Sequence, residues 1–103
     1  MDLCILMDTN DNVATVLQET SPELELVIQD RSMTEVGKVT ANESIPYAHK
    51  ISVTNINKGD CIYKFGSVIG RAISDINKGN YVHVHNVISI KSAESIMNRG
   101  ADK

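Results

Sequence analysis

The stretches VTNINKGDCI, residues 53–62, and ISDINKGNYV, residues 73–82, are two copies of one pattern set 20 positions apart. The residues INKG are identical, and the other positions pair similar residue types, apart from Cys61 with Tyr81. In each copy a β-rich segment enters Asn-Lys-Gly, the glycine allows a positive φ, and a second β-rich segment leaves. Two copies are too few for a solenoid. The repeat therefore predicts two similar turns in a compact β-domain, related by a pseudo-two-fold axis.

The N-terminal half also has the patterns of short strands. The segments LCILM (3–7) and VATVL (13–17) flank the turn residues NDN and predict a hairpin. In ELELVIQD (23–30) apolar and polar residues alternate, which predicts a half-buried strand. The polar residues 30–45 predict a loop with one short strand around 36–39.

The remaining segments complete an all-β pattern. KFGSVIGRA (64–72), with Gly66 and Gly70, predicts a second hairpin between the two copies of the repeat. Only the tail, residues 91–103, has the signals of a short helix, and it has no evident packing partner. We therefore predict one all-β domain over residues 1–103, built of about six to eight short strands.

Composition excludes several classes of protein. The formal net charge is −3 and the basic residues are scattered, which argues against nucleic-acid binding. There is no apolar run long enough to cross a bilayer, and the start MDLCILMD lacks the basic residues of an export signal. Cys4 and Cys61 form no CxxC motif and predict reduced thiols, with a disulfide between them as the alternative. These features predict a cytoplasmic protein, and the scarcity of aromatic residues predicts an aliphatic core.

Two of the three histidines lie in the segment NYVHVHNVISI, residues 80–90. If this segment is a strand, alternate residues share a face. The face expected to point into the core holds Val82, Val84, Ile88 and Ile90, and the opposite face holds Tyr81, His83 and His85. His83 and His85 would then lie roughly 6 to 7 Å apart at their Cα atoms, which lets both bind one metal ion. The alternative is a solvated strand face, because two ligands alone are a weak signal.

The first copy of the repeat does without these histidines, because Tyr63 aligns with His83 and Phe65 with His85. We expect both aromatic rings to fill part of the core. His49 could supply a third metal ligand if the fold brings it near. The charges of Lys50, Lys64 and Arg71 suit an anionic substrate, although such residues are by default solvated.

The segment HKISVTNINKGDCIYKFGSVIGRAISDINKGNYVHVHN, residues 49–86, resembles the small domain or small subunit of the altronate and galactarate dehydratases. The small subunit of sulfolactate sulfo-lyase is a close relative of that family. The family pattern contains an initial HKI, two glycine turns and a final HVHxHN. This chain departs from the pattern at three positions: Tyr81 stands where the family often has His, Phe65 where it often has Tyr, and Ala48 where it often has Gly.

The resemblance implies an SAF-like β-clip domain and a lyase that acts on a small hydroxy acid with a divalent metal, Fe²⁺ or alternatively Mn²⁺. It also implies that a separate large catalytic subunit carries the rest of the enzyme. Combined with the residue types, it gives an expected site with His49 and Lys50 in catalysis, Lys64, Arg71 and Asn86 in substrate binding, and His83 and His85 on the metal.

Three functions stay open at this point. The chain could be the small subunit of a sugar-acid dehydratase, the small subunit of a sulfolactate sulfo-lyase, or a non-catalytic module for carbohydrate binding or assembly. Homo-oligomerisation is also open. The cupin metal motif is rejected, because the first Glu after His85 is Glu94, nine positions on. The motifs of nucleotide-binding loops, serine hydrolases and zinc proteases are absent from the sequence.

Overall fold

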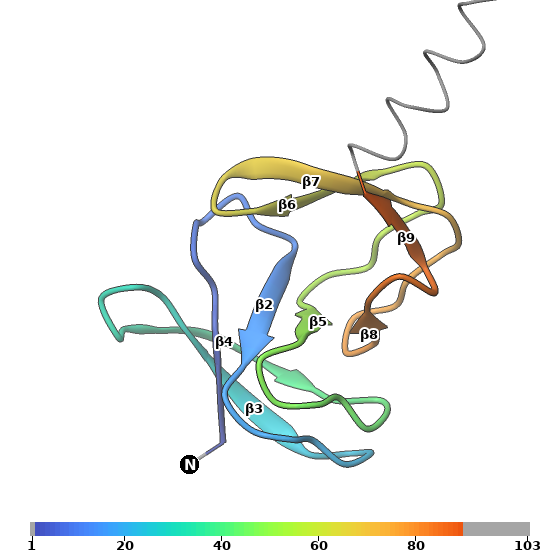
Figure 1. The fold of residues 1–103 in the computed structure, drawn as a ribbon. Helices are drawn as coiled ribbons and strands as arrows, with labels where there is room; N and C mark the ends of the chain where they lie inside the picture. The colour runs from blue at the N-terminus through green and yellow to red at the C-terminus, as the bar shows by residue number, and fades with distance from the viewer. Residues whose placement is uncertain (1, 90–103) are drawn as a thin grey trace, which may run out of the picture.

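A computed structural model describes residues 2–89, and these residues form two β-sheets and no helix (Figure 1). The nine strands are β1 (Leu3–Ile5), β2 (Val13–Val16), β3 (Glu25–Gln29), β4 (Glu35–Thr40), β5 (Lys50–Ser52), β6 (Cys61–Lys64), β7 (Ser67–Ala72), β8 (Tyr81–Val82) and β9 (Val87–Ser89). The all-β prediction is confirmed, with one strand more than expected. The predicted helical tail, residues 91–103, lies outside the described residues, as does Ile90.

The larger sheet has six strands in the order β4-β3-β1-β2-β5-β8, and the smaller has three in the order β6-β7-β9 (Figure 1). The β1–β2 hairpin is antiparallel as predicted, whereas β1 and β3 pair in parallel. The short strand expected around residues 36–39 is β4, which pairs with β3 along five register positions. Residues 2–89 contain no helix long and apolar enough to span a membrane.

The core is aliphatic and has two parts. One part packs against the six-stranded sheet and centres on Leu26, Ile45 and Ile51, all fully buried. The other lies between the repeat and the smaller sheet and consists of Val13, Ile56, Ile62, Ala72, Ile76 and Val82. At about 25 cal/mol per Å² of apolar surface, such side chains supply most of the driving force for folding.

The two copies of the repeat are related by a pseudo-two-fold axis, as predicted. Ile56 and Ile76 exchange two backbone hydrogen bonds, each 2.8 Å long. The strand before each INKG turn pairs with the strand after the other INKG turn, so β5 pairs with β8 and β7 with β6.

Side-chain hydrogen bonds between the two copies follow the same pseudo-two-fold relation. Asn55 Oδ1 accepts a hydrogen bond from the Lys78 amide at 2.9 Å, and Asp75 Oδ1 accepts one from the Lys58 amide at 2.8 Å. The two copies of the INKG repeat therefore pair with each other, although they lie 20 positions apart in the chain.

The β6–β7 hairpin has a two-residue loop, Phe65-Gly66, with φ of 56° and 74°. Positive φ at both positions defines the type I′ turn that suits the twist of a hairpin. Phe65 is 58 % exposed and Tyr63 is 37 % exposed, so the prediction that both fill the core is wrong. The reason is alternation: Ile62 takes the buried face, Tyr63 the opposite one, and Phe65 lies in the turn.

The strand predicted through both C-terminal histidines is also wrong, because β8 ends at Val82. Residues 83–86 form a turn closed by a hydrogen bond from the Val87 amide to the His83 carbonyl at 3.0 Å. Val84 was expected in the core, but it is 78 % exposed at this turn. The two-residue alternation stops where the turn begins.

Candidate functional site

All three histidines gather around Tyr81, and these four residues form what we call the histidine cluster: His49, Tyr81, His83 and His85. The antiparallel pairing of β5 with β8 places Lys50 opposite Val82, so His49, just before β5, comes close to His83. The cluster therefore depends on the same strand exchange that relates the two copies of the repeat.

The rings of the cluster are in contact. His49 Nδ1 lies 2.6 Å from the Tyr81 hydroxyl, at hydrogen-bond distance. The centroids of His49 and His83 are 5.0 Å apart, and the ring of Tyr81 stacks on His83 at 5.3 Å. His85 contacts the other rings through Tyr81, with centroids 5.3 Å apart. Because Tyr81 occupies Nδ1 of His49, its Nε2 is the nitrogen left for a ligand or substrate.

Basic side chains surround His83. Partial burial, together with the nearby His49, Lys50 and His85, lowers the pKa of His83 from 6.5. His83 is therefore neutral at pH 7. The pKa of Lys50 is lowered by burial and, second, by repulsion from Lys64. An anion bound here would raise the pKa of both His83 and Lys50, because an opposite charge favours their protonated forms.

A hollow of about 180 Å³ adjoins the cluster. It is lined by Lys50, Ile69, His83, Val84, Val87 and Ser89. Its wall is mostly apolar, with the ammonium of Lys50 and the imidazole of His83 as its basic groups. It offers a small group room beside the histidines and close to positive charge.

The histidines match a divalent metal such as Fe²⁺ or Mn²⁺ only in part. Among residues 2–89 no group of three or more His, Cys, Asp or Glu side chains is arranged to hold a metal ion. His49 and His83 are close enough to contribute imidazole nitrogens together, which suit such metals. Any further ligands would come from outside residues 2–89. The assignment of His83 and His85 to a metal stays a prediction.

The other predicted site residues lie in different environments. Lys64 is close enough to Lys50 to affect its charge, whereas exposed Arg71 donates from Nη1 to the Gly59 carbonyl at 3.1 Å. Asn86 is buried; its Oδ1 accepts from the His83 amide at 3.0 Å and its Nδ2 donates to the Tyr81 carbonyl at 2.8 Å. Asn86 therefore fixes the histidine-bearing turn, and its role toward substrate stays a prediction.

Sequence reasoning missed Glu43. Its Oε2 accepts a hydrogen bond from the Tyr81 amide at 3.0 Å, so a carboxylate lies against the backbone of the cluster. Glu43 comes from the polar segment 30–45, whose weak periodicity gave no signal for it.

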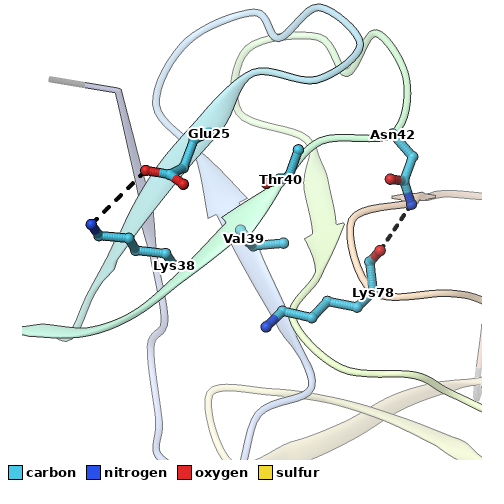
Figure 2. A pocket seen from close by; sticks show the side chains of 6 residues that line it. All are labelled: Glu25, Lys38, Val39, Thr40, Asn42 and Lys78. Carbon is cyan, nitrogen blue, oxygen red and sulfur yellow. Dashed lines mark hydrogen bonds and ion pairs between the residues drawn. The ribbon is translucent and has the colours of Figure 1, made fainter.

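A second hollow, of about 380 Å³, lies beside β4 and is lined by Glu25, Lys38, Val39, Thr40, Asn42 and Lys78 (Figure 2). Lys38 forms an ion pair with Glu25 at 3.9 Å, and both side chains are more than half exposed. Exposed pairs of this kind are typical of a solvated surface. Asn42 Nδ2 donates to the Lys78 carbonyl at 2.8 Å and joins β4 to the second INKG turn.

The family model and the relatives that match this chain agree with one another. Residues 2–90 match the family model described as the altronate/galactarate dehydratase SAF domain. The chain is 34 % identical over 76 residues to an altronate dehydratase of Escherichia coli (strain K12), covering 74 % of this chain and 14 % of that protein. It is 27 % identical over 88 residues to the (2R)-sulfolactate sulfo-lyase subunit alpha of Chromohalobacter salexigens, covering 81 % of this chain and 89 % of that subunit. The subunit alpha of Paracoccus pantotrophus is 35 % identical over 49 residues, which is 48 % of this chain and 73 % of that subunit.

Proposed function

Because the chain belongs to the altronate/galactarate dehydratase SAF-domain family, we propose that it is the small subunit of a metal-dependent hydroxy-acid lyase that works with a separate, larger chain. The reaction we propose is the dehydration of a sugar acid of the altronate or galactarate type. The observation that carries the proposal is the histidine cluster beside Lys50 and its hollow.

The arrangement of charges suits an acid substrate. Lys50 and Lys64 place positive charge beside the histidine cluster, so a substrate carboxylate can bind there. A substrate carboxylate held by Lys50 would place its α-carbon close to the imidazoles of His49 and His83. Positioning of this kind lowers the barrier by removing the entropy cost of the encounter.

Dehydration requires a base for the proton α to the carboxylate and an acid for the departing β-hydroxyl. We assign the base to His49 Nε2, because Nδ1 can keep its hydrogen and donate it to the Tyr81 hydroxyl in both protonation states. The C–H electron pair forms the C=C bond, the β-C–O bond breaks, and the proton taken up by His49 Nε2 passes to the departing hydroxide, which leaves as water. The resulting enol then becomes the 2-keto acid.

A divalent metal, Fe²⁺ or Mn²⁺, would supply Lewis-acid stabilisation of the enediolate when bound. We assign His83 and His85 of this chain to the metal, because His49 serves as the base. The remaining ligands would come from the larger chain, since no third ligand joins the cluster among the described residues.

A second candidate is a sulfolactate sulfo-lyase, in which sulfite leaves in place of hydroxide. The coverage favours it, because the match spans 89 % of a relative that is itself a subunit alpha but only 14 % of the altronate dehydratase. The same base and the same cationic groups would serve in both reactions.

The test is turnover by the complex purified through this chain. The tagged chain is purified from its native extract with ferrous iron present and oxygen excluded. The eluate is assayed for 2-keto acid from altronate and galactarate and for sulfite from sulfolactate. Release of product from one of these acids by a complex with a larger chain supports the proposal and names the substrate. A larger chain without turnover of any of them would favour a non-catalytic module.

A further inference from the structure

Phe65 is an aromatic residue at a position that disfavours it. It is the first residue of the type I′ turn between β6 and β7, with φ of 56°, where Asn-Gly is the preferred pair. Its ring is 58 % exposed, so burial within the chain does not offset this backbone strain. A strained and exposed aromatic side chain points to a role outside the folding of the chain.

Hydrogen bonds with the side chains of Asp11 and Asn12 hold the β6–β7 hairpin, which carries Phe65, in place. The buried carboxylate of Asp11 accepts hydrogen bonds from the Phe65 amide at 2.9 Å and from the Gly66 amide at 2.8 Å. The side chain of Asn12 donates to the Cys61 carbonyl at 2.9 Å and accepts from the Tyr63 amide at 2.8 Å. The hairpin therefore presents the ring from a fixed backbone, which lowers the entropy cost of binding through it.

The Phe65 ring lies beside the first of two basic side chains, Lys64 and Lys50, that connect it to the histidine cluster. The ammonium of Lys64 lies 5.4 Å from the centroid of the Phe65 ring. Lys64 in turn repels Lys50, and Lys50 repels His83. The mostly apolar hollow and the exposed Val84 lie at the His83 end of the series. The series thus combines positive charge with apolar groups at both ends.

We propose that the surface formed by Phe65 and Lys64, next to the histidine cluster, docks the larger chain of the enzyme, with Phe65 as its anchor. This inference rests on the proposed function and assigns the partner a surface. The partner would present an apolar pocket for the ring and a carboxylate for Lys64, and would leave Lys50 and the hollow to the substrate.

The Phe65 ring favours a protein over a sugar acid as the occupant of this surface. A large exposed ring is the kind of side chain that forms the energetic centre of protein interfaces. Docking here would place the histidine cluster at the interface, where the partner can complete it.

The substitution Phe65→Asn separates binding from folding. It removes the ring and creates the preferred Asn-Gly pair, so the melting temperature of the isolated chain should rise. The matched control is Met33→Asn, because Met33 also has a positive φ, 65°, and is 76 % exposed, but it lies in the loop between β3 and β4. Both variants replace a strained, exposed apolar residue by Asn.

The measurement is the Kd of each purified chain for the larger chain isolated from the active complex, at low and at moderate salt. We expect Phe65→Asn to raise the Kd at least about tenfold, Met33→Asn to change it less than about twofold, and salt to weaken the wild-type binding. Equal affinity of Phe65→Asn and the wild type overturns the inference while leaving the proposed function intact. Self-association of the chain that Phe65→Asn abolishes also overturns it, because the occupant is then a second copy. If no larger chain is recovered from the active extract, both the inference and the two-chain function fail.

Discussion

The two glycines of the INKG repeat are equivalent in sequence and in backbone conformation, yet we predict that they tolerate alanine very differently. Gly59 has φ of 94° and Gly79 has φ of 93°. A Cβ at Gly59 would meet no atom within 4 Å, whereas a Cβ at Gly79 would lie 2.1 Å from the Thr40 carbonyl oxygen and 3.1 Å from Asn42 Nδ2. The pseudo-two-fold axis thus relates an open turn to one against which the end of β4 packs.

The expected costs follow from these contacts. Alanine at either position adopts a left-handed conformation, which costs about 1 to 2 kcal/mol. At Gly79 the Thr40 backbone must also move by more than 1 Å, roughly, to reach an ordinary contact, and overpacking of this kind costs about 1 to 3 kcal/mol. The shift weakens the hydrogen bonds from the Asn42 amide to the Gly79 carbonyl, 2.9 Å, and from Asn42 Nδ2 to the Lys78 carbonyl, 2.8 Å (Figure 2). We therefore expect Gly79→Ala to lose about 3 to 5 kcal/mol and Gly59→Ala only about 1 to 2 kcal/mol.

Urea unfolding of the wild type and both variants, followed by far-ultraviolet circular dichroism, measures this difference. The slopes of the transitions should agree, so the midpoints report the free energy of unfolding directly. Equal losses for Gly59→Ala and Gly79→Ala would refute the reasoning, since the two turns would then have equivalent surroundings. A larger loss for Gly59→Ala would contradict the contacts of β4 with the second turn.

Four further predictions concern stability and reactivity. Ala48 has φ of 68°, so Ala48→Gly should raise the free energy of unfolding by about 0.5 to 1 kcal/mol in the same urea assay; a loss would contradict the left-handed backbone. Asp11→Ala removes two charge-assisted hydrogen bonds to the β6–β7 turn and should cost about 3 kcal/mol, and a loss below about 1 kcal/mol would show that the turn does not need this clamp. Burial raises the pKa of the Cys4 thiol to about 12, so a thiol reagent at pH 8 should modify only the half-buried Cys61 until denaturant is added; rapid labelling of both native thiols would argue against a buried Cys4. Because the folded-state pKa of His83 lies below 6.5, unfolding takes up a proton there as the pH falls, so stability should decrease below about pH 6.5 less steeply in His83→Asn than in the wild type; identical pH profiles would contradict the lowered pKa.

The fold could be predicted because its signals are local. The INKG repeat contains both the positive φ of its glycines and the strands on either side, and their spacing leads to the exchange between β5–β8 and β6–β7. The alternation in residues 23–30 correctly predicted a half-buried strand, in which Leu26 and Ile28 are the buried side chains. The parallel pairing of β1 with β3 has no local signature, because it depends on the packing of segments far apart in the chain.

The candidate site could be predicted only in part. Its residue types were evident, and the resemblance named His49 and His83. The geometry was wrong where a turn interrupted the strand: His83 approaches His49 across the sheet, while His85 contacts Tyr81 from the turn. The hydrogen bond between His49 Nδ1 and the Tyr81 hydroxyl could not be predicted, because the β5–β8 pairing brings together residues that lie 32 positions apart.

The most direct test of the proposed lyase is the kcat of the complex reassembled with His49→Gln and, separately, with His83→Gln. The control is Lys38→Gln, whose ion pair with Glu25 is exposed and outside the histidine cluster. We predict that each histidine variant still assembles with the larger chain but loses at least about 100-fold in kcat, because a general base contributes about 10²- to 10⁴-fold and a metal ligand a comparable amount, while Lys38→Gln retains full activity. Full activity of both histidine variants in the assembled complex would contradict the catalytic role of the cluster and leave the chain as an assembly module.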